Sequence, residues 1–583
     1  MKTVEIKING NPIVVKTGTS ILEAAKLAGV KIPSLCAHPD LEAWGACGIC
    51  VVKIEGQPRL VRACSTKIVE GQNYITHDPE IQSVRRTVIE LILSNHPQEC
   101  LTCARNQSCE LQTLAAEYSI REIPFDMNVR RLPKDVSTTS IVLDPTKCIQ
   151  CGRCAIVCQE VQNVWALEFL NRGEHTRIAP AADVLLDESP CIKCGQCSAH
   201  CPVGAIYEKD ETQKFLNAVR EKGVHVSVQI APAVRVALGE AFGMKPGEVV
   251  TGKIYAALRR LGVDSVFDTN FSADLTIMEE GSELVERLVN GKGVLPQLTS
   301  CCPAWTDYME KYYPDMIPHF STAKSPMMMQ GAMTKTYFAQ MKKLDPAKIC
   351  SVAIMPCTAK KFEISRCGDM KSSGYCDVDL VLTTRELARL IKIAGINFAE
   401  LEEEQADSPI GMYTGAGTIF GVTGGVMEAA VRTAYNLVTG EELANVNVEA
   451  VRGMEGVKRG VVDIKGTKVK VAVAHGMANV QDLVEEIRAA KKEGKERPYD
   501  FIEVMACRGG CISGGGQPYG TEDSVRDARI AGIYSDDTHS AIRCSHQNPE
   551  IIHIYDKFLE KPLSHKAHQY LHTHYEERPV YKK

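Results

Sequence analysis

The first 78 residues alternate apolar and polar positions in several short runs. The segments TVEIKING, NPIVVKTG, GICVVKIEG and RACSTKIV place apolar residues at about every second position, a period that predicts β-strands. SILEAAKLAG repeats its apolar residues at helical spacing instead, and Ser20 stands at the N-cap position. We therefore expect a small β-rich domain with one helix over residues 1–78.

The pattern changes from about residue 211 onward. Short apolar runs, HVSVQIAP, KICSVAIMPC, VKVAVAHG and YDFIEVMAC, alternate with helical stretches such as DLVEEIRAAKKEG. Runs with few polar positions are typical of strands buried on both faces of an α/β sheet. Ligands of open α/β sheets lie beyond the carboxyl ends of the strands. The loops MPCTAKKFE and MACRGGCISGGGQP are therefore candidate walls of a site.

The length and the charge of the chain limit the kinds of protein that it can be. A chain of 583 residues is too long for one core and predicts roughly three to five domains. The formal charge of −5 is mild and argues against a nucleic-acid partner. The start, MKTVEIKINGNPIVV, has no signal region, and no apolar run reaches the roughly 18 residues of a membrane span. We expect a cytoplasmic protein without membrane association.

The 24 cysteines gather at short, repeated spacings, which without an export signal favours metal ligation over disulfides. The first group includes a glycine-rich loop, GACGIC, and comprises Cys36, Cys47, Cys50 and Cys64. Four thiolates suit an iron–sulfur cluster or zinc. The spacing resembles that of the ferredoxin-like domains at the front of hydrogenases and respiratory complex I, which favours a 2Fe–2S cluster.

The segment SNHPQECLTCARNQSCELQTLA, within residues 79–138, offers only three cysteines, whereas a closed site needs a fourth ligand. His96 lies four residues before Cys100. An isolated histidine near a helix end is most often a surface residue, but beside Cys100, Cys103 and Cys109 we interpret His96 as a ligand. The segment resembles the 4Fe–4S module with one histidine and three cysteine ligands that the same two enzyme groups contain.

Residues 139–210 contain an internal repeat. CIQCGRCAIVC and CIKCGQCSAHCP each read C-x2-C-x2-C-x3-C, the signature of two-cluster ferredoxins, in which the fourth cysteine of each run serves the other cluster. One 4Fe–4S cluster is expected on Cys148, Cys151, Cys154 and Cys201. The second is expected on Cys191, Cys194, Cys197 and Cys158. The four upstream sites together predict an electron wire that leads to chemistry farther along the chain.

Nine cysteines remain. Four have no partner at metal-site spacing and are expected to be structural: Cys350, Cys367, Cys376 and Cys544. The other five are Cys301, Cys302, Cys357, Cys507 and Cys511. Cys301 and Cys302 are adjacent in TSCCPAW, so one metal ion rarely takes both side chains. If either is excluded, four ligands are left for one cluster and its neighbour is free.

Three loops, TSCCPAW, MPCTAKKFE and EVMACRGGCISGGGQP, resemble the signature loops of iron-only (FeFe) hydrogenases in sequence and in order. With the upstream cluster sites the resemblance covers essentially the whole chain. It is strongest to the catalytic subunits of multimeric, NADP-reducing or electron-bifurcating hydrogenases.

The resemblance implies a multidomain α+β and α/β fold. It contains an N-terminal β-grasp ferredoxin domain (1–78), a histidine-ligated 4Fe–4S module (79–138), a two-cluster ferredoxin module (139–210), a large two-lobed α/β hydrogenase domain (211–540) and a C-terminal helical segment wrapped around it (541–583).

The resemblance also assigns the H-cluster, where protons and electrons become hydrogen. A 4Fe–4S cube would be held by Cys302, Cys357, Cys507 and Cys511. Cys511 would also bridge to a two-iron subsite that carries carbonyl, cyanide and an azadithiolate bridge. Cys301 would be a free thiol that relays protons, rather than a packing thiol.

The proton path would continue from Cys301 through Glu280, Ser321, Glu283 and Arg287. Glu280, Glu283 and Arg287 share one face of the predicted helix DLTIMEEGSELVERL, which without the resemblance reads as a solvated charged face. The family also places Lys360 against a cyanide ligand. Around the two-iron subsite it places Met355, Met505, Ala231 and Pro232; methionines on apolar strands are otherwise most often core residues.

Partners are also implied by the resemblance. No Walker A loop or strand–GxGxxG–helix unit is found, and GAGTIFG (415–421) has the wrong glycine spacing. NADP or NAD would therefore bind to a flavoprotein partner subunit. Ferredoxin, small 2Fe–2S subunits in a hetero-oligomer and maturation proteins complete the set.

The main alternative function is a hydrogen sensor of the same fold. An iron–sulfur assembly protein or a pure electron carrier fits less well, because the loops and the relay residues are all present. We interpret the histidines of DKFLEKPLSHKAHQYLHTHY as part of the wrapping segment rather than as a metal site.

Overall fold

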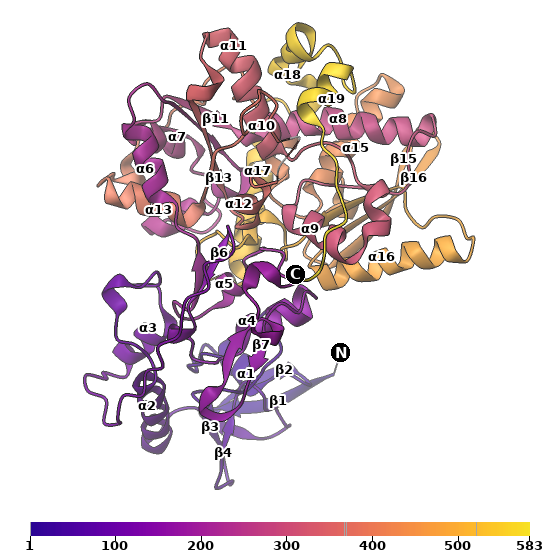
Figure 1. Cartoon of the computed structure of the whole chain (residues 1–583). Helices are drawn as coiled ribbons and strands as arrows, with labels where there is room; N and C mark the ends of the chain where they lie inside the picture. Colours follow the sequence, from indigo (N-terminus) through magenta and orange to yellow (C-terminus); the bar gives the residue numbers. More distant parts are fainter. Residues whose placement is uncertain (1, 367, 369, 521, 583) are drawn as a thin grey trace.

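The computed structural model describes residues 2–366, 368, 370–520 and 522–582, so Cys367 lies outside the described residues. Figure 1 shows two lobes. The chain up to β9 (Ile206–Glu208) forms the lower lobe, and the chain from α6 (Thr212–Arg220) onward forms the upper lobe. The helix α5 (Gln196–His200) lies where the two lobes meet.

The N-terminal domain is the predicted β-rich unit. Its strands pair in the order β2-β1-β5-β3-β4, with β1 parallel to β5. Ser20 caps α1 (Ile21–Leu27) through a reciprocal capping box with Glu23, as the sequence predicted. The strands are β1 (Thr3–Ile8), β2 (Asn11–Lys16), β3 (Val51–Ile54), β4 (Leu60–Arg62) and β5 (Asn73–Ile75).

The prediction of a strand over RACSTKIV is wrong. Strand β4 ends at Arg62, and the chain then turns over residues 63–65. This turn brings the Cys64 thiol within hydrogen-bonding range of the Cys36 and Cys50 thiols. Strand preference depends on tertiary context, and here the turn that gathers the cysteines prevails over local alternation.

The two halves of the cysteine repeat share a local structure. In each half a glycine with positive φ, Gly152 (81°) or Gly195 (72°), directly precedes a short helix. Glycine adopts this conformation at little cost, so the chain can turn sharply between the second and third cysteines of each run. The lower lobe also contains α2 (Pro79–Ser94), α3 (Glu110–Glu117), α4 (Arg153–Ile156), the strand β6 (Ile141–Leu143) paired with β9, and the hairpin β7 (Glu168–Leu170) and β8 (Arg177–Ala179).

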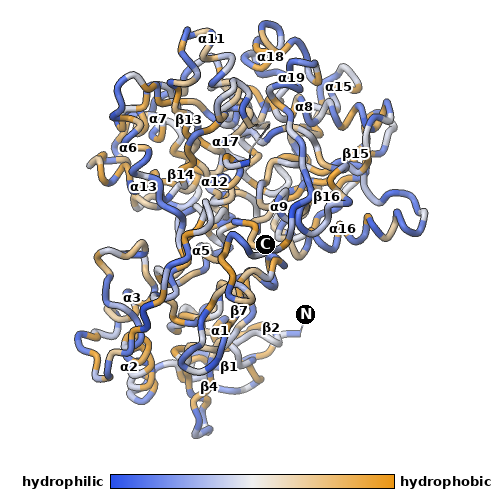
Figure 2. Tube along the Cα trace, viewed as in Figure 1, coloured by the Kyte–Doolittle hydropathy of each residue, from blue (hydrophilic) through white to orange (hydrophobic). Residues whose placement is uncertain are grey.

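Two four-stranded sheets form the centre of the upper lobe. The sheet β11-β10-β13-β14 is parallel throughout, and the sheet β12-β17-β16-β15 is parallel except for β15. The four predicted buried strands are confirmed as β10, β13, β16 and β17. In Figure 2 the interior of this lobe is largely hydrophobic. The strands are β10 (His225–Ile230), β11 (Ser265–Asp268), β12 (Gln297–Leu298), β13 (Ile349–Met355), β14 (Leu380–Thr383), β15 (Val457–Ile464), β16 (Thr467–His475) and β17 (Phe501–Met505).

Helices cover the two sheets. α7 contacts β11, α13 contacts β14 and α16 contacts β16, while α8 crosses the lobe and contacts α10, α14 and α15. Within the described ranges no helix is long and apolar enough to cross a membrane. The helices are α7 (Thr251–Arg260), α8 (Thr269–Val289), α9 (Pro303–Tyr312), α10 (Pro326–Met333), α11 (Ala339–Lys342), α12 (Ala359–Glu363), α13 (Thr384–Ile393), α14 (Gly415–Ile419), α15 (Gly425–Thr439), α16 (Met477–Lys492), α17 (Asp523–His539), α18 (Pro549–Ile554) and α19 (His565–Leu571).

The C-terminal tail runs back across the upper lobe. Beyond α19 it descends past α9 towards the lower lobe (Figure 1). Its backbone is held along this course, since the N–H groups of Thr573 and Arg578 donate to the carbonyl oxygens of Thr322 (2.8 Å) and Glu310 (2.9 Å). The tail thus contacts segments that lie far away in the sequence.

Candidate active site

The three signature loops meet at one cavity in the upper lobe. TSCCPAW follows β12 and begins α9, MPCTAKKFE follows β13, and MACRGGCISGGGQP follows β17. The cavity therefore lies beyond the carboxyl ends of strands from both sheets, where ligands of α/β sheets bind. The predicted site residues that line it are Ala231, Pro232, Cys301, Cys302, Met355, Cys357, Lys360, Met505, Cys507 and Cys511.

Four thiols converge on this cavity, those of Cys302, Cys357, Cys507 and Cys511. Burial raises the pKa of Cys507, and the nearby thiols of the other three raise it further. Backbone N–H groups of Ala506 and Trp305 donate to the sulfur of Cys302. Such thiols lose their protons when they ligate a metal, and four thiolates suit an iron–sulfur cluster. The donor set therefore fits the predicted cube.

The two adjacent cysteines diverge. Cys302 packs against the apolar cluster that contains Cys357, whereas Cys301 packs against a second cluster that contains Met505. Burial raises the pKa of the Cys301 thiol, and the nearby Glu280 carboxylate raises it further. The structure thus places Cys302 beside a candidate ligand and Cys301 beside a carboxylate.

Lys360 reaches the same cavity with its charge already partnered. Its Nζ donates to the carbonyl oxygen of Cys301 (3.1 Å) and to Glu363 (2.7 Å). Burial alone would lower the pKa of this ammonium, but Glu363 raises it above its ordinary value. Sequence reasoning missed Glu363. The sequence feature that could have indicated Glu363 is its position three residues after Lys360, because residues at this spacing share one face of a helix.

Helix α8 carries the predicted carboxylates into the interior. Glu280 is 1% exposed, and burial, followed by the charge of Glu283, raises its pKa to about 8. Its Oε2 atom has no hydrogen-bond partner among the described residues. The Ser321 hydroxyl donates to Glu283 (2.8 Å), and Glu283 also pairs with Arg287 (2.7 Å). Ser321 also lies within hydrogen-bonding range of Glu280, so these four side chains form an inner series rather than a solvated face.

The upstream cysteines assemble in the predicted sets. The Cys36 thiol lies within hydrogen-bonding range of the thiols of Cys47 and Cys64, and Cys50 approaches Cys64. In the repeat, burial raises the pKa of Cys154, and Cys148, Cys151 and Cys201 raise it further. For Cys197 the corresponding neighbours are Cys194, Cys191 and Cys158. The fourth cysteine of each run therefore lies with the other run's set, as the signature predicts.

His96 lies with the three cysteines of its segment. His96, Cys100, Cys103 and Cys109 line one small cavity. The Nε2 atom of His96 is buried without a hydrogen-bond partner in the described part of the chain. Gly204 closes the cavity, because a Cβ atom there would lie 2.4 Å from the Cys103 sulfur. An unpartnered imidazole nitrogen beside three thiols fits the predicted cluster.

Sequence reasoning missed the contacts that join the repeat to the active-site cavity. Gln196, next to Cys197, donates to the Cys507 sulfur (3.2 Å) and to the Ser513 carbonyl oxygen (3.0 Å). A Cβ atom on Gly515 would lie 2.6 Å from the Cys194 carbonyl oxygen. The second cysteine set of the repeat is therefore packed directly against the candidate cube ligands.

Arg153 joins three of the predicted cluster sites, and sequence reasoning missed it as well. Its guanidinium, 3% exposed, donates twice to Glu110 (2.8 and 2.9 Å) and once to the Ala37 carbonyl oxygen (2.9 Å). Glu110 follows Cys109, Ala37 follows Cys36, and Arg153 itself precedes Cys154. No sequence spacing could reveal this contact, because its partners lie 43 and 116 residues away.

Five families match successive parts of the chain. Residues 224–515 match the family described as the iron-only hydrogenase large subunit, C-terminal domain, and residues 523–578 match the iron hydrogenase small subunit. Three families match upstream: a 2Fe–2S cluster binding domain (1–78), the NADH-ubiquinone oxidoreductase-G iron–sulfur binding region (85–124) and a 4Fe–4S dicluster domain (147–205).

Individual relatives match over nearly the full length. The chain is 47% identical to the NADP-reducing hydrogenase subunit HndD of Solidesulfovibrio fructosivorans and 41% identical to iron hydrogenase 1 of Clostridium pasteurianum, with 99% of this chain and 100% of each relative covered. A solved [FeFe]-hydrogenase of Chlamydomonas reinhardtii superposes with a TM-score of 0.56 at 42% identity, covering 64% of this chain and 100% of that one. The chain therefore belongs to the iron-only hydrogenases and is an oxidoreductase.

Proposed function

We propose that this chain catalyses the reversible reduction of protons to hydrogen and is the catalytic subunit of a multimeric hydrogenase. One observation carries the proposal. Four candidate ligand thiols and a fifth thiol, Cys301, converge on one buried cavity, where Cys301 lies beside the buried carboxyl of Glu280. A site that reduces protons needs both a redox group and a proton path, and this cavity has residues for each.

The chain's own residues would hold five metal groups. The H-cluster would be held by Cys302, Cys357, Cys507 and Cys511, and when bound it supplies the redox centre at which protons and electrons combine. One 2Fe–2S cluster and three accessory 4Fe–4S clusters would occupy the four upstream sets. Maturation proteins would be needed to assemble the two-iron part of the H-cluster. Met355, Met505, Ala231 and Pro232 would exclude water around that part, because they are apolar residues that line the cavity.

Protons would move along the contacts of α8. The Cys301 thiol would exchange a proton with Glu280, whose raised pKa keeps the carboxyl able to donate and accept near neutral pH. Ser321 would pass the proton to Glu283, its hydrogen-bond acceptor. Arg287 would hold Glu283 in place at the outer end of the proton path. The Arg287 guanidinium is itself fixed, because it donates to the Val294 carbonyl oxygen (2.7 Å).

Electrons would travel through the lower lobe. The Gln196–Cys507 contact is the inner end of this route, and the 2Fe–2S and histidine-ligated sites are its outer ends. Ferredoxin and an NAD(P)-binding flavoprotein, with small 2Fe–2S subunits, would exchange electrons there in a cytoplasmic hetero-oligomer. The full-length similarity to a subunit named as NADP-reducing supports this arrangement.

The test is hydrogen evolution from reduced viologen by the purified, matured chain alone under strict anaerobiosis. Rapid evolution would show that the chemistry is complete in this polypeptide. If all clusters and the two-iron group are shown to be present and no hydrogen forms, the sensor function or an obligatory partner subunit replaces the proposal.

A further inference from the structure

Three potential metal ligands meet outside every cluster site described above. They are Glu442, Cys544 and His546, and their ligand atoms all lie within 4.8 Å of one another. Sequence spacing could not show that Cys544 has a partner in Glu442, because the two residues are about 100 positions apart along the chain. The structure joins them by packing α15 against the segment that precedes α18.

Each of the two polar side chains is already oriented by a neighbour. His546 places Nδ1 3.3 Å from the Thr433 hydroxyl, so its Nε2 points to the Glu442 carboxylate, 3.1 Å from both oxygens. The amide of Asn436 donates to Oε1 of Glu442 (3.1 Å). Metal-binding histidines and carboxylates are typically held by such outer contacts. Cys544 adds a buried thiol at 3% exposure.

The charges nearby permit a cation. Arg432 and Arg543 lie close to Cys544, but both guanidinium groups are paired with Asp537, and Arg432 also pairs with Glu428. The side chain of Glu442 is 53% exposed, so an ion could enter from solvent.

His38, Asp40 and His200 form a second group of potential metal ligands. The charges around this group do not permit a cation. Asp40 there is already bound by Arg508 and Arg526. Two fixed positive charges on its one carboxylate would repel an added cation, so this group is not a metal site.

We propose that Glu442, Cys544 and His546 form a zinc site with one open position. One sulfur, one imidazole nitrogen and one carboxylate are zinc ligands in proteins. The site crosses a family boundary, since Glu442 lies in the region matched by the large-subunit domain and the other two in the region matched by the small subunit. The bound ion would link the segment that matches the small subunit to the large-subunit domain. This role is structural and does not depend on the hydrogen chemistry.

The experiment equilibrates the matured full-length chain anaerobically with zinc chloride in a weak metal buffer. Bound zinc and iron are counted together by mass spectrometry, so that any zinc exchange into the iron sites is seen as lost iron. Zinc X-ray absorption should show one sulfur at about 2.3 Å and nitrogen at about 2.0–2.1 Å. Hydrogen exchange in residues 523–578 should slow when zinc is bound.

The variants Cys544→Ser and His546→Gln should bind zinc at least tenfold more weakly, with the iron content unchanged. Glu442→Gln should weaken binding too, and it carries little folding risk because the side chain is half exposed. Cys376→Ser is the matched control, since it removes an exposed thiol elsewhere and should bind zinc as the parent does. Equal zinc in all variants, no sulfur in the absorption spectrum, or no zinc on the parent chain would each overturn the proposal.

Discussion

At the residue scale, burial decides the chemistry of the Glu280 carboxyl. In the folded chain its pKa is about 8, whereas an unfolded glutamate has a pKa of about 4.3. Between these values the folded state holds a proton that the unfolded chain releases. The contribution of Glu280 to the free energy of unfolding therefore falls as the pH rises from about 4 to 8, and it is constant above that range. The protein retains a buried acid near neutral pH at a cost in stability.

Replacing Glu280 by glutamine tests that balance. Glu280→Gln should lower hydrogen evolution by about 10² or more, because an amide cannot relay a proton. It should also flatten the pH dependence of thermal unfolding between pH 5 and 8. Glu286→Gln is the control on the same helix, where the carboxylate pairs with Lys292 (2.8 Å) at the end of α8. Parent-like turnover in Glu280→Gln would remove this residue from the path.

Cys301 is the second residue whose role depends on its surroundings. Cys301→Ala should keep the full iron content, because Cys302 remains to complete the set of four, and should lose turnover by about 10² or more, since the proposed donor is gone. Iron analysis and viologen-driven evolution measure the two effects. Cys350→Ala, on β13 but outside the cavity wall, is the control. Loss of iron in Cys301→Ala would show instead that this thiol is a ligand.

At the scale of elements, short helices set the spacing of the cluster sites. α4 starts at Arg153, which binds beside the candidate ligands of two other predicted sites, and α5 starts at Gln196, which binds Cys507. Each helix thus carries one of its own cysteines and one side chain that reaches another module. Because the first residue of each helix is bonded to another module, the helix and the cysteine that it carries are held close to that module.

Arg153→Gln should loosen the lower lobe while leaving every cysteine in place. Losing the charged hydrogen bonds to Glu110 should weaken the packing of the modules by about 2 kcal/mol. Hydrogen exchange should quicken around Cys36 and Cys109, and the magnetic coupling between clusters should weaken in electron paramagnetic resonance. Arg172→Gln removes an exposed arginine of the same module and should change neither. If exchange stays slow in Arg153→Gln, the modules are held by other contacts.

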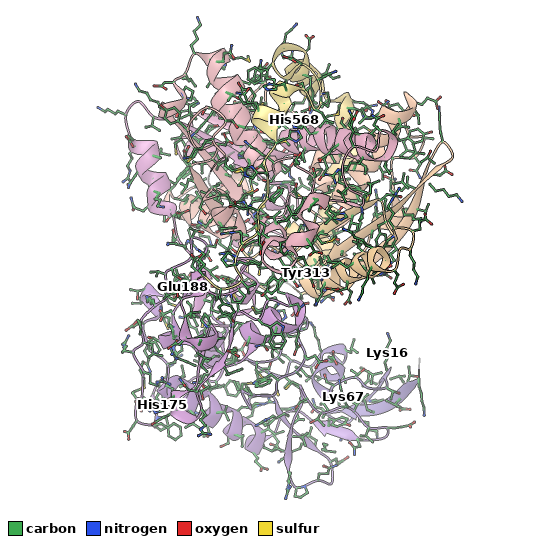
Figure 3. The ribbon with its side chains drawn as sticks, turned by 45° about the vertical axis from the view of Figure 1, so that its right-hand side comes forward. Lys16, Lys67, His175, Glu188, Tyr313 and His568 are labelled. Atoms are coloured by element: carbon green, nitrogen blue, oxygen red, sulfur yellow. The ribbon has the colours of Figure 1, made fainter. Side chains whose placement is uncertain are left out.

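At the scale of the molecule, ionic contacts join the N-terminal domain to the upper lobe. Asp40 of the N-terminal domain binds Arg508 and Arg526 of the upper lobe and lies 3.4 Å from His200. Burial would raise the pKa of Asp40, but His200 and Arg526 hold it well below its usual range. This contribution to stability is complete above an unfolded pKa of about 3.9 and is lost as pH falls below it. In Figure 3 the labelled Lys16 and Lys67 mark this domain in the lower part of the molecule.

Asp40→Asn should release the N-terminal domain from the upper lobe. Arg526 would keep only its contact with the exposed Asp523, so losing the charge-assisted hydrogen bonds to Asp40 should cost about 2 kcal/mol. Limited proteolysis at neutral pH should cut the variant between the N-terminal domain and the rest of the chain faster than the parent. Glu42→Gln, an exposed neighbour in the same loop, is the control. Equal cleavage rates in Asp40→Asn and the parent would show that the ion pairs do not hold the lobes together.

Much of the fold followed from local pattern. The helix capped by Ser20 and the four buried strands depend on periodicity within ten residues or so, and the structure has them where predicted. The strand over RACSTKIV failed because Cys64 turns towards cysteines outside that window. Glu363 had a weak local signal, whereas Gln196 and Arg153 had none, since their partners lie up to 317 residues away.

The cysteine groups and their order were readable from the sequence, because ligand spacing is set by loops of a few residues. Tertiary structure alone decided which side of the cavity each member of the Cys301–Cys302 pair faces, that Glu280 is buried enough to hold its proton near pH 8, and that Glu442 meets Cys544. The divergence of the two cysteines, the burial of Glu280 and the meeting of Glu442 with Cys544 all depend on how separate elements pack. The spacing of residues along the chain does not encode that packing.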